Sequence, residues 1–218
     1  MVLLEYAVPI ARGIGLTLVV YIGAALVAIS VGTPVGLLLA RAKPPLRALL
    51  RSYVEVFRGT SAVVQLFWIF YVLPIFGVHL PAVAAAIIGL GLCFGAYTAE
   101  AIRSCVLQIP KGQFEAAMAL GMRRSVAFRL VILPQLVQLA LPFIENIAIL
   151  LLKATAGASL ITVPELTFTG YVMNSATYMT FTIFMMLLVV YYLIASVVTL
   201  LASRAKRRVD RWSAPARV

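Results

Sequence analysis

The chain has 218 residues, of which 63% are hydrophobic and only 11% are charged, and its formal net charge is +11. About a quarter of the residues in a soluble globular domain are charged, so this composition excludes an ordinary water-soluble domain. The basic residues flank long apolar runs and form no single basic face, so the charge does not indicate a nucleic-acid partner.

Five apolar runs follow one another along the chain. They cover residues of about 13–40, 59–78, 80–102, 130–152 and 177–202. A bilayer core about 30 Å thick needs a helix of roughly 20 mainly apolar residues, and backbone groups in lipid must be hydrogen-bonded within the helix. We therefore expect one all-α integral membrane domain over residues 1–218, with five transmembrane helices.

The basic residues are divided very unequally between the two sides of this predicted membrane domain. Sixteen of the 18 lie after the first, third and fifth runs, and only Arg12 and Lys153 lie on the other side. Basic residues accumulate in cytoplasmic loops. This distribution predicts an N-terminus outside the cell and a cytoplasmic C-terminus.

The basic connection between the third and fourth runs, residues of about 111–129, carries a spaced motif. It consists of Glu115-Ala116-Ala117, three residues, Gly121, nine residues, Val131, one residue and Leu133-Pro134. Alanine favours a helix and has a small side chain, whereas glycine commonly ends a helix. We expect a short helix over 113–120 with Glu115 in its first turn, ended by Gly121 and followed by a second helical stretch.

This spacing resembles the coupling loop of ATP-binding-cassette (ABC) importer permeases, and other segments are similar to the polar amino acid branch of that family. These segments are Thr17-Leu18, Phe57-Arg58-Gly59-Thr60, Val64-Gln65-Leu66-Phe67, Ala96-Tyr97-x-Ala99-Glu100, Ile109-Pro110-Lys111-Gly112-Gln113, Leu151-Leu152-Lys153 and Val163-Pro164-Glu165-Leu166. The resemblance implies a type I ABC importer permease (MetI-like) fold in the bacterial inner membrane. It assigns Glu115, Ala116, Ala117 and Gly121 to coupling with an ATPase.

The resemblance also implies the partners of the chain. They are a cytoplasmic ATPase dimer, a second permease subunit that is identical or homologous, an extracytoplasmic solute-binding protein and the surrounding membrane lipid. The sequence has no Gly-x-x-x-x-Gly-Lys-Ser/Thr phosphate loop, so we expect a separate subunit to bind and hydrolyse ATP. We expect no metal, cofactor or catalytic residue in this chain, and no nucleic-acid partner.

Polar residues inside apolar runs are costly and often mark a transport pathway. Glu145 and Asn146 lie within the fourth run, where the resembled family usually has Gly-Asn. We expect both to line a substrate pocket, with a helix–helix hydrogen bond as the alternative. Lys153 and Thr155, at the outer end of this run, are assigned to the same pathway, although Lys153 could instead extend to the membrane interface.

Two further expectations concern charged and loop residues. Glu100 lies three residues before Arg103, a spacing that favours an ion pair on one helix. The connection over about 153–176 is long and apolar, with Pro164 placed to begin a short helix, so we expect it to act as a gate or lid.

The sequence therefore predicts a permease subunit of an ATP-driven, binding-protein-dependent importer for a polar amino acid or similar zwitterion. A compatible solute such as ectoine remains an alternative, because departures from the family pattern flank the fourth run. A self-contained carrier is a weaker alternative, since no internally related halves are visible. A membrane enzyme would need a cluster of catalytic groups, whereas the one His and seven acidic residues are scattered.

Overall fold

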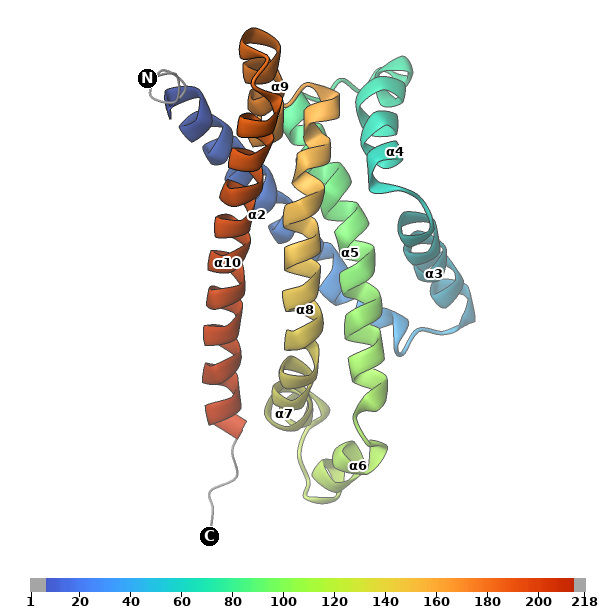
Figure 1. The fold of residues 1–218 in the computed structure, drawn as a ribbon. Helices are drawn as coiled ribbons and strands as arrows, with labels where there is room; N and C mark the ends of the chain where they lie inside the picture. Colours follow the sequence, from blue (N-terminus) through green and yellow to red (C-terminus); the bar gives the residue numbers. More distant parts are fainter. Residues whose placement is uncertain (1–6, 214–218) are drawn as a thin grey trace.

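The computed structural model describes residues 7–213, and every regular element in that range is helical (Figure 1). The main helices are α2 (Ala7–Leu39), α3 (Pro44–Gly59), α4 (Ala62–Phe67), α5 (Ala82–Gln108), α6 (Lys111–Ala119), α7 (Arg124–Ala127), α8 (Leu133–Thr155), α9 (Leu166–Thr177) and α10 (Thr180–Ser213). Short π or 3-10 turns join them: η1 (Trp68–Val72), η2 (Leu73–Phe76), η3 (Phe128–Ile132) and η4 (Ala156–Ile161). Four continuous helical runs in this range are long and apolar enough to cross a membrane, and a bent pair makes a fifth candidate.

Small residues hold α2 against α5, the most extensive helix contact in the bundle. The buried positions of α2 recur every three or four residues and include Ala24, Ala28, Gly32 and Gly36. A Cβ atom added to Gly32 would lie only 2.5 Å from the carbonyl oxygen of Gly95. Since lipid tails are as apolar as leucine, helices in a membrane associate through such close backbone approaches.

The second apolar run begins at a sharp corner in the chain. Of the span expected over 59–78, the structure has the helical segment Ala62–Phe76, and the preceding helix α3 meets this segment at 105°. The side-chain amide of Gln65 stabilises this corner by donating to the carbonyl of Phe57 (2.9 Å) and to Oγ1 of Thr60 (2.7 Å). Apolar periodicity records which residues avoid water but carries no information about such a bend.

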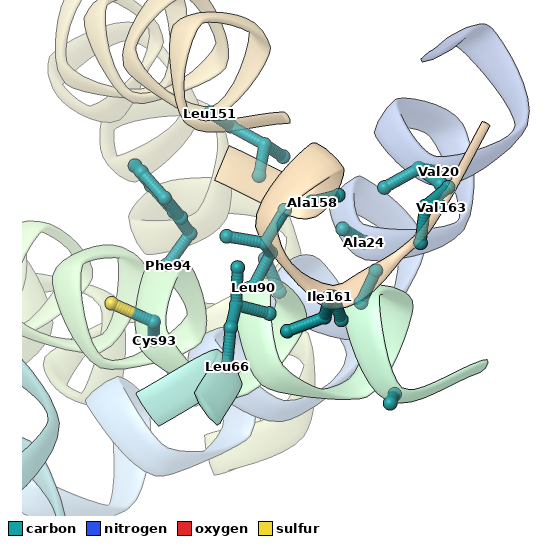
Figure 2. Packing of buried hydrophobic residues seen from close by; sticks show 13 residues of the cluster. Val20, Ala24, Leu66, Leu90, Cys93, Phe94, Leu151, Ala158, Ile161 and Val163 are labelled. Carbon is teal, nitrogen blue, oxygen red and sulfur yellow. The ribbon is translucent and has the colours of Figure 1, made fainter. Parts of the chain in front are cut away.

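An apolar core joins the segment Ala62–Phe76 to the rest of the bundle. Leu66 of α4, Leu90 of α5, Leu151 of α8 and Ile161 of η4 are all buried and lie in one cluster (Figure 2). This core lies toward the α9 end of the molecule, whereas α6 and α7 lie at the opposite end (Figure 1). A second cluster of buried residues, including Ile102, Ile132 and Leu136, packs the bundle near α6.

Candidate functional site

The motif-bearing helix α6 lies beyond the ends of α5 and α8 (Figure 1). The short helix expected at 113–120 is confirmed, and it spans Lys111–Ala119. The placement of Glu115 in its first turn was wrong, because the helix starts earlier, directly after the extended Pro110. The positive helix end therefore gives Glu115 little stabilisation, since that effect is confined to the first turn.

Gly121 ends α6 in the way its sequence position suggested. Its φ of +77° lies in the left-handed region, which costs glycine little. The N–H of Gly121 donates to the carbonyl of Met118 (3.0 Å), and the N–H of Met122 donates to that of Ala117 (3.2 Å). This pair of bonds is the Schellman motif, and it fixes the direction in which the chain turns back toward α8.

One face of α6 is anchored and the other is free. Ala117 is 3% exposed, whereas Ala116 and Ala119 are exposed and Leu120 is 79% exposed. The helix contacts the rest of the chain mainly through η3 and α7. It thus presents a small-residue surface away from the bundle, as a helix that docks onto a partner would.

A groove of about 370 Å³ lies between the end of α3, α5 and α8. Its polar lining consists of Arg58, Tyr97, Glu100, Ser104 and Asn146. The guanidinium of Arg58 lies 5.4 Å from the ring centroid of Tyr97, within range of a cation–π interaction. The groove therefore combines a cation, a carboxylate and an amide against apolar walls.

The ion pair expected between Glu100 and Arg103 is present, with Oε1 of Glu100 accepting from Arg103 at 2.8 Å. The other carboxylate oxygen of Glu100 accepts no hydrogen bond from residues 7–213. Glu100 therefore retains one oxygen for a donor that enters the groove.

The four predicted pathway residues do not come together. Asn146 lines the groove, but its neighbour Glu145 is partly buried on another side of α8. Thr155 is fully buried and donates to the carbonyl of Leu152 at 2.7 Å. Lys153 is exposed in the last turn of α8.

Arg58 and Tyr97 were not among the predicted pathway residues. Both belong to segments that carried the family resemblance, so a signal was present in the sequence. What the sequence lacked was the corner at residue 60, which places the end of α3 beside α5. Because Arg58 and Tyr97 are 39 positions apart, the sequence does not indicate that their side chains lie together.

A second unpredicted cluster surrounds Glu165 at the other end of the molecule. This side chain is 0% exposed. Its Oε2 accepts from the hydroxyl of Tyr191 (2.8 Å) and lies 3.2 Å from Oγ1 of Thr17, while its Oε1 accepts from the N–H of Phe168 (2.9 Å). One carboxylate therefore connects α2, the start of α9 and α10.

The same carboxylate caps α9. Pro164 was expected to begin this helix, but the helix starts at Leu166 with Glu165 as its N-cap residue. Thr17 supports the cap, because its Oγ1 accepts from the N–H of Leu166 at 3.1 Å. Thr167 adds a further bond, with its Oγ1 2.9 Å from the hydroxyl of Tyr191. A buried carboxylate needs such partners to offset its loss of water.

Comparison with known proteins identifies the family. A profile of the binding-protein-dependent transport system inner membrane component matches residues 32–212. The chain belongs to this family. It is 39% identical over 166 residues to a probable amino-acid ABC transporter permease, y4tF, of Sinorhizobium fredii (73% of this chain, 70% of the relative). It is 37% identical over 171 residues to the L-cystine transport system permease TcyB of Bacillus subtilis (78% and 73%).

Solved structures agree with this assignment. An amino acid ABC transporter crystallised with histidines has a chain of 32% identity and TM-score 0.85, covering 94% of this chain and 96% of that one. A subunit of the methionine transporter MetNI has TM-score 0.81 at 22% identity, covering 94% and 98%, and this second likeness shows the fold alone. The resemblance to ABC importer permeases and the type I fold are thus confirmed. The chain is a permease subunit of a binding-protein-dependent importer in the bacterial inner membrane and not a catalytic enzyme.

Proposed function

We propose that this permease passes a polar amino acid or similar zwitterion across the membrane and is driven by a separate ATPase dimer that docks on α6. The observation that carries the substrate class is the groove between α3, α5 and α8. It is supported by the names of the relatives, which describe amino-acid and cystine transport.

The groove offers complementary groups for both ends of a zwitterion. The guanidinium of Arg58 can donate to a carboxylate, and the free carboxylate oxygen of Glu100 can accept from an ammonium group. Asn146 adds an amide that can donate and accept. A groove with only one sign of charge would favour a simple anion or cation instead.

The predicted residues outside this groove keep a place in the proposal as pathway residues. Glu145 would contact substrate only if α8 turns during transport, because it faces a different side from Asn146. Lys153 and Thr155 lie nearer the α9 end, along the route by which a delivered solute would enter. Replacing Glu145 with Gln without altering transport would remove it from the pathway.

The exposure of α6 supports its proposed coupling role. We propose that Glu115, Ala116 and the turn at Gly121 contact the ATPase, while Ala117 packs inward and transmits movement to η3 and α8. In this arrangement the α6 end is cytoplasmic. The α9 end then faces the solute-binding protein, and a second permease subunit completes the pathway.

The connection between α8 and α9 would serve as the gate at the outer end. Residues 156–161 form a 3-10 turn, and the left-handed Thr162 (φ +66°) redirects the chain toward Glu165. The Glu165 cluster fixes the far side of this connection. Because Ala158 and Ile161 of the 3-10 turn are buried in the apolar core, opening of the gate would require this part of the core to separate.

The test is uptake of labelled solutes by proteoliposomes that contain the chain with its co-purified ATPase and binding protein. Polar amino acids and ectoine are compared with and without ATP inside. We expect ATP-dependent uptake of an amino acid, and an R58Q variant to raise KM by about tenfold or more, since a hydrogen bond to a charged group is lost. The control R47Q removes a charge from the same helix outside the groove and should transport normally. Uptake without ATP, or equal effects of R58Q and R47Q, would contradict the proposal.

A further inference from the structure

A second apolar groove lies at the α6 end, where α2 ends and α3 begins. Its volume is about 650 Å³, and we call it the elbow groove. Leu37, Leu38, Leu46, Val106 and Phe128 supply its apolar walls. Leu37, Val106 and Phe128 pack against a buried cluster, whereas Leu38 is 50% exposed and Leu46 is 43% exposed, so these two side chains are left largely uncovered by the described chain.

Cations surround this apolar surface. Arg41 and Lys43 line the elbow groove itself. An adjoining groove of about 510 Å³ shares Arg41 and adds Lys111, Arg124 and the single acid Glu115. None of these four cations forms an ion pair with a side chain that the structure describes; the pairs among those side chains are Arg51–Glu55 and Glu100–Arg103. The guanidinium of Arg41 instead lies 5.7 Å from the ring centroid of Phe128.

The adjoining helix α3 indicates the depth of the groove in the membrane. It exposes Leu46 and Leu49 (69% exposed) next to the charged Arg47 and Arg51. A helix with adjacent apolar and basic surfaces lies in the interface between lipid tails and headgroups. The elbow groove therefore opens where headgroup phosphates and the first part of the acyl chains are both within reach.

We propose that the elbow groove is a binding site for an anionic phospholipid. The phosphate lies between Arg41 and Lys43, and an acyl chain lies along Leu38, Leu46 and Phe128. Lys111 and Arg124 attract a headgroup with additional negative charge. Free inorganic phosphate would leave the apolar walls uncovered, and a zwitterionic lipid would bring a cation toward a site that already has a net positive charge. Basic pockets between membrane helices bind anionic headgroups in this way.

Binding of this lipid would connect four elements that transport must move together. The site involves the ends of α2 and α5, the start of α3 and η3, which carries α6. An occupied groove would hold η3 against α2, so that a shift of α6 would be passed to the membrane helices and not lost at η3. Transport rates in vesicles should therefore increase with the content of anionic lipid and saturate when the site is filled.

The experiment is native mass spectrometry of the full chain in detergent, titrated with phosphatidylglycerol or phosphatidylcholine that have the same acyl chains. We expect the wild type to retain phosphatidylglycerol preferentially, and R41Q/K43Q to weaken its retention by about tenfold. The matched control K206Q/R207Q removes two exposed charges from the same end of the molecule and should keep the preference. A42F, which fills the groove, should weaken retention of both lipids while leaving the four cations in place.

Three results would overturn the proposal. Equal retention of the two lipids by the wild type would show that no headgroup is recognised. Complete displacement of phosphatidylglycerol by inorganic phosphate would show a simple anion site. An unchanged preference for phosphatidylglycerol in R41Q/K43Q would show that these two cations do not hold the headgroup.

Discussion

The two ends of this permease place a glutamate side chain in opposite environments. At the α9 end, Glu165 has no exposure to solvent and bonds to groups from three helices. At the α6 end, Glu115 is exposed and forms no ion pair with residues 7–213. A glutamate therefore anchors the structure at the α9 end, and a glutamate is available to a partner at the α6 end.

This contrast matches the mechanical roles proposed for the two ends. A fully bonded buried carboxylate keeps α2, α9 and α10 in fixed relative positions, because a partly bonded one would be costly. An exposed helix with small side chains can accept another surface without repacking the bundle. Mechanical coupling needs a part that stays fixed, here the Glu165 cluster, and a part that can contact a partner, here α6.

The largest expected effect comes from removing the anchor. Glu165→Ala deletes the cap of α9 and leaves donors from Tyr191 and Phe168 without their acceptor. We expect the free energy of unfolding to fall by about 3 kcal/mol, measured by thermal unfolding of the purified chain in detergent. Glu115→Ala is the matched control and should change it by less than about 0.5 kcal/mol. Similar losses in both variants would show that the two ends are equally rigid.

The second effect concerns the turn after α6. Gly121→Val places a β-branched residue at φ +77°, where the backbone strain is about 1–2 kcal/mol. No atom lies within 4 Å of the added Cβ, so the cost is conformational and not a clash. We expect a modest loss of stability but a large loss of ATP-driven uptake, because α6 changes direction.

Two control variants distinguish the effect of the backbone direction after α6 from the effect of a larger side chain. Gly121→Asn should retain most uptake, because asparagine tolerates the left-handed region. Gly112→Ala, in the same helix with an ordinary φ and open space around its Cβ, should be neutral. If Gly121→Val retained uptake, the left-handed turn at residue 121 would not be needed for coupling.

The third effect is a single bond in the anchor. Tyr191→Phe removes the hydroxyl that donates to Glu165 at 2.8 Å, and we expect it to cost about 1 kcal/mol of stability. Tyr192→Phe is the natural control because its side chain is 68% exposed and should change little. A larger effect at Tyr192 than at Tyr191 would contradict the placement of this cluster.

These comparisons also show what the sequence could and could not predict. The helix at α6, its end at Gly121 and the pair Glu100–Arg103 depend on neighbours within four or five positions, so local spacing was sufficient. The five apolar runs marked the membrane-spanning candidates, of which four are continuous helical runs and the other belongs to a bent pair. The permease fold itself was inferred through the family resemblance.

The missed features all depend on distant residues. Glu165 meets partners 148 and 26 positions away. Arg58 lies beside Tyr97 where the chain turns between α3 and α4, at the corner where Gln65 bonds to Phe57 and Thr60. The pattern Val163-Pro164-Glu165-Leu166 marked the right place but suggested proline as the start of the helix. A single sequence does not reveal which of its polar residues will be buried together.

The smallest expected effect on stability comes from a substitution on the exposed face of α6. Ala116→Trp adds a large side chain to the exposed face of α6, so the free energy of unfolding should change by less than about 0.5 kcal/mol. Uptake and ATPase binding should nevertheless be lost, because the added ring prevents the close approach that alanine allows. Ala117→Trp, one residue along, has the opposite profile: its Cβ is buried, so overpacking should destabilise the chain by about 1–3 kcal/mol. Unfolding curves and pull-down of the ATPase measured on both variants distinguish the two faces, and an Ala116→Trp variant that still binds the ATPase would place the docking surface elsewhere.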